Sequence, residues 1–355
     1  MRKIFLLLTI LLLGFGLAAC GDEAVGFPEF DEDNVVELSA QEMVTLFESI
    51  DYTSVDSESV RITTKGHIFV KEESDPEDTT YSSLDDFKLT IDASIYALMS
   101  EVIGDVRLHG EGTIDFNQVS EYSSEWYEDS SANAMKGSAG IYFVEGYLYM
   151  MVDGEYAENG DALEEVSFKQ KLNTEVTQTM WDEAMSEVDP ETQIDTTTPQ
   201  EYIDMIEAGD FDELMEAIPS LKVYQDGTTY SIVFTVTKQI VLDSMEDMIV
   251  AYAKAMGETM TQAQIDEIIT EAETEINNMV DELSFTYVIS ITGNRITKVA
   301  EKLVFKSVDG NIDINMTTVI DFGVDLPTFP NDLDTYDPVD QPGEGYFDDE
   351  EMAKS

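Results

Sequence analysis

Imidazole groups are scarce in this sequence, although they are the side chains best suited to proton transfer and metal binding near neutral pH. The two histidines, His67 and His109, each fall on the polar side of an alternating apolar segment. That position favours a solvated surface role over a catalytic or metal-binding one. A metal could join them if their strands were neighbours, but no His-x-x-x-His spacing supports such a site. We therefore predict no metal ligand.

Carboxylates and hydroxyls give no clearer catalytic pattern. The 75 acidic residues are so abundant that no pair of them indicates glycosidase or protease chemistry. Residues 137–140 (Gly-Ser-Ala-Gly) lack the spacing of a nucleophile elbow, and no phosphate loop or dinucleotide fingerprint is present. Residues 309–313 have the glycine misplaced for a calcium loop and no closing glutamate, which favours a hairpin turn. We expect no enzyme, no catalytic residue and no cofactor.

The residues best suited to hold a ligand lie in an apolar hairpin over residues 141–152, with Glu145 and Gly146 as a two-residue turn. One face of this hairpin carries Ile141, Phe143, Leu148, Met150 and Val152, and the other carries Tyr142, Val144, Tyr147, Tyr149 and Met151. A strand pair that is apolar on both faces needs cover on each side. The second set is therefore our candidate ligand-binding set, with packing in the core as the alternative.

The N-terminus carries a different kind of reactive group. Arg2 and Lys3 precede an apolar run over residues 4–17, which is typical of a signal peptide and short for a membrane-spanning helix. The run ends in Leu-Ala-Ala-Cys, and this motif resembles the lipobox of bacterial lipoproteins. The resemblance implies cleavage before Cys20 and a diacylglycerol thioether on its thiol. Acyl chains such as palmitate would then anchor the protein in the outer face of the bacterial cell membrane, in an extracytoplasmic position.

Charge and cysteine content exclude several partners. The chain has 18 basic and 75 acidic residues, a net charge of -57, so binding to nucleic acid phosphates is excluded. Such acidity favours weak association with Ca²⁺ without a dedicated site. Cys20 is the single cysteine, so the mature chain forms no internal disulfide. Hydrophobic residues make up 43% of the sequence, which is enough for a real core.

Changes in periodicity predict the order of the structural elements. A capped amphipathic helix is expected at about 39–50, followed by strands over 62–70, 89–97 and 106–116 and the hairpin over 141–152. A helical middle part begins near residue 198. Strands return over 221–237 and in a closing meander over 285–322, and a helical insertion separates these two strand regions. The predicted divisions are a signal peptide (1–19), an acylated acidic tether (20–38), an α+β domain (39–326, with the helical insertion at about 242–282) and a disordered acidic tail (327–355).

Meanders on both sides of a helical middle predict an α+β fold: a large twisted antiparallel β-sheet, like a half-barrel, packed around helices, with a helical-hairpin insertion. The early helix, the long strands, the Tyr- and Gly-rich hairpin and the closing meander resemble the LolA/LppX-like extracytoplasmic lipoprotein carriers. That resemblance implies an unclosed half-barrel that holds acyl chains. We expect a lipid-anchored binding protein for an apolar or lipid ligand in a curved-sheet cavity. The alternative is a cell-surface structural or protein-interaction lipoprotein with cation-dependent contacts.

Overall fold

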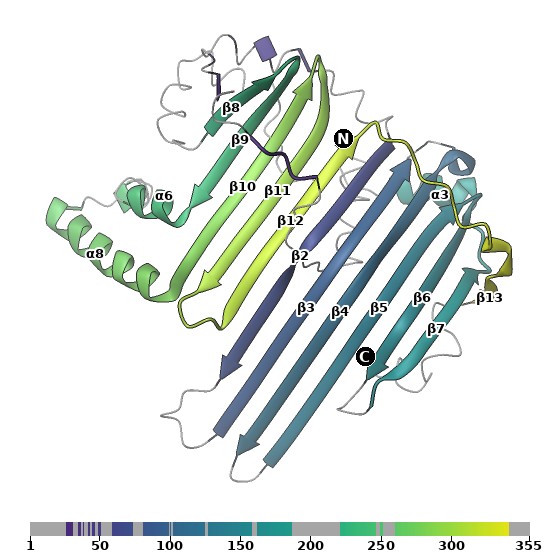
Figure 1. Ribbon diagram of the computed structural model, residues 1–355, viewed down its shortest axis with the longest axis horizontal. Coiled ribbons are helices and arrows are strands. Elements are labelled where there is room, and N and C mark those ends of the chain that lie inside the picture. Colours follow the sequence, from purple (N-terminus) through teal and green to yellow (C-terminus); the bar gives the residue numbers. More distant parts are fainter. Residues whose placement is uncertain are drawn as a thin grey trace.

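The described part of the chain folds into one large sheet. The structure, a computed structural model, describes residues 26–30, 35–36, 38, 42, 45–46, 49–50, 59–73, 81–98, 100, 102–124, 127–157, 162–186, 221–245, 249–250 and 260–340. Within these residues, 13 strands pair in the order β1-β8-β9-β10-β11-β12-β2-β3-β4-β5-β6-β7-β13 (Figure 1). Neighbouring strands are antiparallel except at the edge, where β13 pairs in parallel with β7.

The strands are β1 (Val35–Val36), β2 (Ser59–Glu73), β3 (Tyr81–Leu98), β4 (Arg107–Ser124), β5 (Tyr127–Val144), β6 (Tyr147–Ala157), β7 (Glu164–Leu172), β8 (Leu221–Asp226), β9 (Thr229–Thr237), β10 (Val280–Thr292), β11 (Arg295–Ser307), β12 (Ile312–Phe322) and β13 (Asp337–Val339). The α-helices in the described residues are α3 (Gln178–Ser186), α6 (Lys238–Asp243) and α8 (Gln262–Met279). Two single turns of 3-10 helix are η3 (Ile103–Asp105) and η5 (Leu333–Thr335).

Alternation of polar and apolar residues gives the sheet two chemically different faces. Residues paired directly across neighbouring strands share a face, and one such row defines the polar face: Arg61, Tyr96, His109 and Tyr142. The residues between them in sequence define the opposite, apolar face, which carries Ile62, Ile95 and Ile141. On β2–β5 most aliphatic residues therefore lie on the apolar face and the charged residues on the polar face. On β9–β12 the polar face also carries a buried apolar cluster that includes Val233, Val288 and Val319.

Cross-strand ion pairs stabilise the polar face. The Asp321 carboxylate lies 2.6 Å from Arg61 Nη2 and 3.3 Å from Lys298 Nζ, and its side chain is 12% exposed. Lys65 pairs with Asp92 at 2.9 Å on the neighbouring strands β2 and β3. Opposite charges meet across strands in one register only, so these pairs favour the observed alignment.

The hairpin predicted over residues 141–152 is confirmed. β5 ends at Val144 and β6 begins at Tyr147, which leaves Glu145 and Gly146 as the turn. Both turn residues have positive φ, 53° and 80° respectively, as a two-residue hairpin turn between twisted strands requires. Tyr142 therefore pairs with Tyr149 across the two strands, on the polar face.

The predicted α+β class is wrong. The described helices do not form a layer around which a half-barrel wraps: α6 packs on β9 and β10, α8 packs on β10, and α8 projects from the margin of the sheet (Figure 1). α8 begins with a capping box formed by Thr261 and Gln264. Of the helical hairpin expected at 242–282, the described residues include α8, which contacts the sheet at β10, while residues 246–248 and 251–259 lie outside the described residues. More of the chain forms strands than the sequence analysis expected. The described strands join in a single mixed sheet instead of a sheet packed around a layer of helices.

A segment near the N-terminus belongs to the fold. Residues 26–30 pack on the polar face at β8–β12, where the Phe30 ring lies 4.7 Å from the Tyr224 ring between centroids. Lys298 Nζ donates a hydrogen bond of 2.7 Å to the Gly26 carbonyl oxygen. The prediction of a tether over residues 20–38 is therefore wrong for 26–30, because Phe27 and Phe30 bury apolar rings.

The C-terminal segment 324–340, here called the strap, crosses the polar face over the upper ends of β2 to β7 (Figure 1). It contains η5 and β13, and Tyr336 and Val339 are buried. The prediction of a disordered tail from residue 327 is wrong for 327–340, since these buried side chains and the β13–β7 pairing hold the strap on the sheet. Residues 341–355 lie outside the described residues.

No described helix is both long enough and apolar enough to cross a bilayer. The predicted signal peptide, residues 1–19, and the predicted acylation site Cys20 lie outside the described residues. So do most of the first helix expected at 39–50 and the helical middle part expected after residue 198.

Candidate functional site

A row of rings crosses the polar face on β3, β4 and β5. Ring centroids lie 6.2 Å apart for Tyr96 and His109 and 5.1 Å apart for His109 and Tyr142, and both contacts are edge-to-face. Gly140 makes room for this row, because a Cβ at Gly140 would lie 2.5 Å from the Tyr142 hydroxyl oxygen. Tyr142 can therefore lean along its own strand over Gly140, towards Glu111 on β4, which is the cross-strand partner of Gly140.

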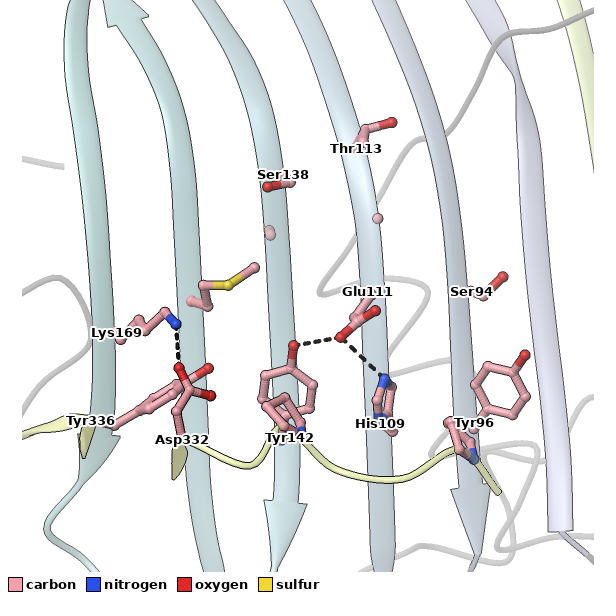
Figure 2. A pocket seen from close by; sticks show the side chains of 15 residues that line it. Ser94, Tyr96, His109, Glu111, Thr113, Ser138, Tyr142, Lys169, Asp332 and Tyr336 are labelled. Atoms are coloured by element: carbon pink, nitrogen blue, oxygen red, sulfur yellow. Dashed lines mark hydrogen bonds and ion pairs between the residues drawn. The ribbon is translucent and has the colours of Figure 1, made fainter. Parts of the chain in front are cut away.

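Glu111 is the centre of the hydrogen bonding in this row (Figure 2). The Tyr142 hydroxyl donates to Glu111 Oε1 at 2.7 Å, and His109 Nε2 lies 3.2 Å from the same oxygen. The Glu111 side chain is 55% exposed, whereas that of His109 is 9% exposed. Burial, and then the bond to Glu111, raise the pKa of Tyr142, so the phenol remains a donor well above neutral pH.

The strap is fixed above β7 by an ion pair. Lys169 Nζ donates to Asp332 Oδ2 at 2.5 Å, and this bond raises the pKa of Lys169 and lowers that of Asp332. Tyr336, the residue directly after η5, packs edge-on against Tyr149, and the two ring centroids lie 5.8 Å apart. Phe329 lies over His109 with centroids 5.9 Å apart. Aromatic contacts and one ion pair therefore hold the strap against the polar face.

A pocket of about 670 Å³, here called the strap pocket, lies between the strap and the polar face (Figure 2). Its lining residues come from five strands and the strap: Ser94, Tyr96, His109, Glu111, Gly112, Thr113, Ser138, Ala139, Tyr142, Met151, Lys169, Pro327, Pro330, Asp332 and Tyr336. Its size falls within the range of about 300–1,000 Å³ that is usual for small-molecule sites. Polar and aromatic groups converge in it from residues distant in sequence.

The predicted ligand-binding set is only partly brought together in this pocket. Tyr142 and Met151 line it. Tyr149 packs under Tyr336 instead, and the Tyr147 hydroxyl bonds to Glu175 at 3.1 Å. Val144 is half-buried on the same face but does not line the pocket.

Sequence reasoning missed three of the charged residues at the pocket. Glu111 was hidden among many other acids, and Lys169 and Asp332 meet only because the strap returns across the sheet. A possible signal was the short cluster of Phe329, Tyr336 and Val339 inside the acidic C-terminal segment, since aromatic and aliphatic residues at such positions seek cover.

The histidine predictions are partly corrected. Both histidines lie on the polar face, as the alternation predicts, and His67 pairs with Asp313 at 3.0 Å. His109 is buried rather than solvated, because Phe329 covers it. Strands β2 and β4 are separated by β3, so the two imidazoles are not on neighbouring strands. Within the described residues, no group of three or more His, Cys, Asp or Glu could hold a metal ion.

The apolar face is the second surface that could hold a ligand. At one end of the strands it is buried, at Val60, Ile62, Ala97 and Leu108. Further along the strands Ile68, Ile91, Ile114, Phe116 and Ile314 are half-buried, whereas Leu89, between Ile68 and Phe116, is buried. Phe87 and Phe116 lie edge-to-face there with centroids 5.7 Å apart. No described helix lies over this lower half of β2–β5 in Figure 1.

Small residues crowd the middle of the apolar face. A Cβ at Gly112 would lie 2.6 Å from the Cβ of Ala93, and a Cβ at Gly137 would lie 2.5 Å from the Asp153 carbonyl oxygen. Glycines at such positions let strands approach closely and bend the sheet. Ala93, Gly112 and Ala139 are direct cross-strand neighbours on β3, β4 and β5, so this part of the apolar face carries only small side chains.

Comparisons with known proteins identify no family. No protein family model matches the chain, and no curated protein matches it. A solved structure from Brucella abortus, described as a β-barrel-like protein of a domain of unknown function (DUF1849), is similar at 9% sequence identity and a TM-score of 0.14. The match covers 75% of this chain and 97% of that one. The resemblance to the LolA/LppX-like carriers therefore remains a prediction.

Proposed function

We propose that this chain is a non-enzymatic, extracytoplasmic binding protein, anchored to the outer face of the cell membrane by acyl chains on Cys20, which holds an apolar ligand such as a lipid. The ligand would lie on the apolar face rather than in a cavity enclosed by helices. Support comes from a single observation: the half-buried aliphatic and aromatic side chains that continue across β2–β5.

Half-burial is what a sheet face gives where no described element packs on it. Side chains on neighbouring strands shield one another laterally, but the outward ends of Ile91, Ile114 and Phe116 keep contact with solvent. A contiguous apolar surface of this kind favours binding of an apolar partner, since each 1 Å² removed from water contributes about 25 cal/mol. The buried end at Val60 and Leu108 would limit how far an acyl chain could extend.

A lipid-binding experiment tests this proposal. The mature chain carrying Cys20→Ser, which removes the acyl chains of the anchor itself, would be purified from bacteria, extracted and examined for bound lipid by mass spectrometry. A fluorescent fatty acid would then be titrated. We expect Phe116→Glu to weaken its binding by roughly 10-fold or more, because a charge would replace an apolar contact.

Asn117→Glu is the matched control. Asn117 is the next residue on β4 but faces the polar side, so the same charge there should leave fatty acid binding unchanged. Absence of co-purified lipid together with equal titrations of the two variants would rule out the proposal. A melting temperature raised by calcium but not by lipid would instead favour the cation-dependent surface role.

A further inference from the structure

The strap pocket has the construction of a second ligand site, on the face opposite to the proposed lipid surface. Its floor includes the backbone of β4 and β5 at Gly112 and Ala139, whose side-chain positions face the other side of the sheet. Its far wall is the strap, with Pro327 and Pro330, whose rings restrict the backbone. The pocket therefore reaches the strand backbone between the polar side chains, and its wall is stiff.

Hydroxyl groups and one central carboxylate converge on this space. Ser94, Thr113 and Ser138 line it with hydroxyls, each of which can both donate and accept a hydrogen bond. Glu111 Oε1 is held by Tyr142 and His109, and the side chain is still 55% exposed. A ligand in the pocket would therefore meet a fixed carboxylate and, around it, hydroxyl groups that can act as hydrogen-bond donors or acceptors (Figure 2).

The charges at the pocket disfavour an anionic ligand. Lys169, the lysine of the lining, is already paired with Asp332 at 2.5 Å. The net charge of the whole chain, -57, adds a repulsive field for any anion. A neutral molecule with several hydroxyl groups can donate to Glu111 and exchange bonds with the serine and threonine hydroxyls without breaking the ion pair.

Apolar surfaces complete the match to such a molecule. Tyr96, Met151 and Tyr336 present ring and thioether surfaces among the polar groups. Saccharide rings carry hydroxyls at their edges and C–H groups on their faces, so they need both kinds of contact at once.

The buried His109 adds a further unused polar atom. Its Nδ1 has no hydrogen-bond partner within the part of the chain that the structure describes. Buried polar atoms are normally paired with protein or ligand groups. The Nδ1 atom is covered by its neighbours, and the ring nitrogen on the Glu111 side is Nε2.

We propose that the strap pocket binds a neutral polyhydroxylated small molecule of the mono- or disaccharide class, with Glu111 accepting hydrogen bonds from its hydroxyls while Ser94, Thr113 and Ser138 surround it. This inference does not rest on lipid binding, because the pocket and the apolar face lie on opposite sides of the sheet.

Isothermal titration of the full mature chain with glucose, maltose, cellobiose and diacetylchitobiose tests this. Choline and glucuronate serve as cationic and anionic comparison probes. We expect at least one saccharide to bind and both charged probes to fail. Glu111→Gln should weaken saccharide binding about 10- to 100-fold, since a carboxylate is the stronger acceptor. Thr113→Val, which changes an exposed side chain, should weaken it several-fold without loss of folding.

Asp115→Asn is the matched control for Glu111→Gln, because Asp115 is on the same face of β4, pairs with Lys136 and lies outside the pocket lining. It should bind saccharide like the unaltered chain, as should Phe116→Glu, the variant that tests the lipid proposal. Failure of every saccharide, preference for choline or glucuronate, or equal effects of Glu111→Gln and Asp115→Asn would each overturn the inference.

Discussion

Lys169 on β7 and Asp332 on the strap lie 2.5 Å apart between Nζ and Oδ2, although 163 positions separate them in sequence. This ion pair joins the last described segment of the chain to the sheet. Its neighbour Tyr336 is buried, so the strap has one charged and one aromatic attachment above β6 and β7.

Attachment of the strap should depend on pH. The pKa of Asp332 is lowered from 3.8 by the bond to Lys169, so its stabilising contribution is complete above pH 3.8 and is lost as the pH falls through the lowered value. The pKa of Lys169 is raised from 10.5, so its contribution is lost only as the pH rises beyond that value. The protection factors of the strap amides, measured by hydrogen exchange relative to the intrinsic rate at each pH, should therefore fall below pH 3.8.

Lys169→Met should remove this acid dependence and accelerate strap exchange at neutral pH. Lys136→Met is the control, because Lys136 pairs with Asp115 on the same face without touching the strap. Equal exchange rates for both variants would show that the aromatic contacts hold the strap without the ion pair.

Tyr142→Phe should destabilise the fold by about 0.5–1.5 kcal/mol, because it removes the hydrogen bond to Glu111 while keeping the buried ring. In the unaltered chain the raised pKa of Tyr142 means that the unfolded state loses the phenolic proton first. Stability should therefore fall as the pH rises above 10.0. Urea unfolding of both chains measures this, and an unchanged alkaline slope in Tyr142→Phe would contradict it.

Asp321→Asn should destabilise the protein by about 1–3 kcal/mol, since it leaves Arg61 and Lys298 facing each other on a largely covered part of the polar face. Asp92→Asn is the matched comparison. Asp92 is 46% exposed, so its pair with Lys65 should contribute less than about 1 kcal/mol. The denaturant midpoint of Asp321→Asn should therefore be lower than that of Asp92→Asn.

Gly112→Ala should destabilise the sheet by about 1–3 kcal/mol, because the new methyl group would lie 2.6 Å from the Cβ of Ala93 and force β3 and β4 apart. Gly104→Ala provides the control, as no atom lies within 4 Å of its added Cβ. Thermal melts that show equal stability for these two variants would mean that the strands can separate without loss.

Alternation of side chains made much of the sheet predictable. The strands that contain Ile62, Ile91 and Ile114 follow a period of two, and so does the closing meander apart from two register shifts between β10 and β11. The early part of β5 and the strand β7 were missed, because acids and serines dilute the apolar pattern there. Helical periodicity at α8 was genuine, but periodicity does not show what a helix packs against, and this misled the fold class.

The candidate site was less accessible to sequence reasoning. Tyr142 and Met151 followed from the hairpin register, which local turn chemistry determines. Glu111, Lys169 and Asp332 depend on the path of the strap, and composition indicated disorder for that segment because acids and prolines dominate it. Three apolar side chains, Phe329, Tyr336 and Val339, were enough to hold it on the sheet.

The hydrogen bond between Lys298 and the Gly26 carbonyl also limits where the protein can reside. Gly26 follows Cys20 by six positions, and an extended chain advances at most about 3.6 Å per residue. The segment between these two residues therefore spans no more than roughly 20 Å. With acyl chains on Cys20, as proposed, the sheet would stay beside the phospholipid headgroups instead of sampling the space beyond them. An apolar ligand could then pass between the sheet and the bilayer over a short distance, without diffusion of the protein away from the membrane.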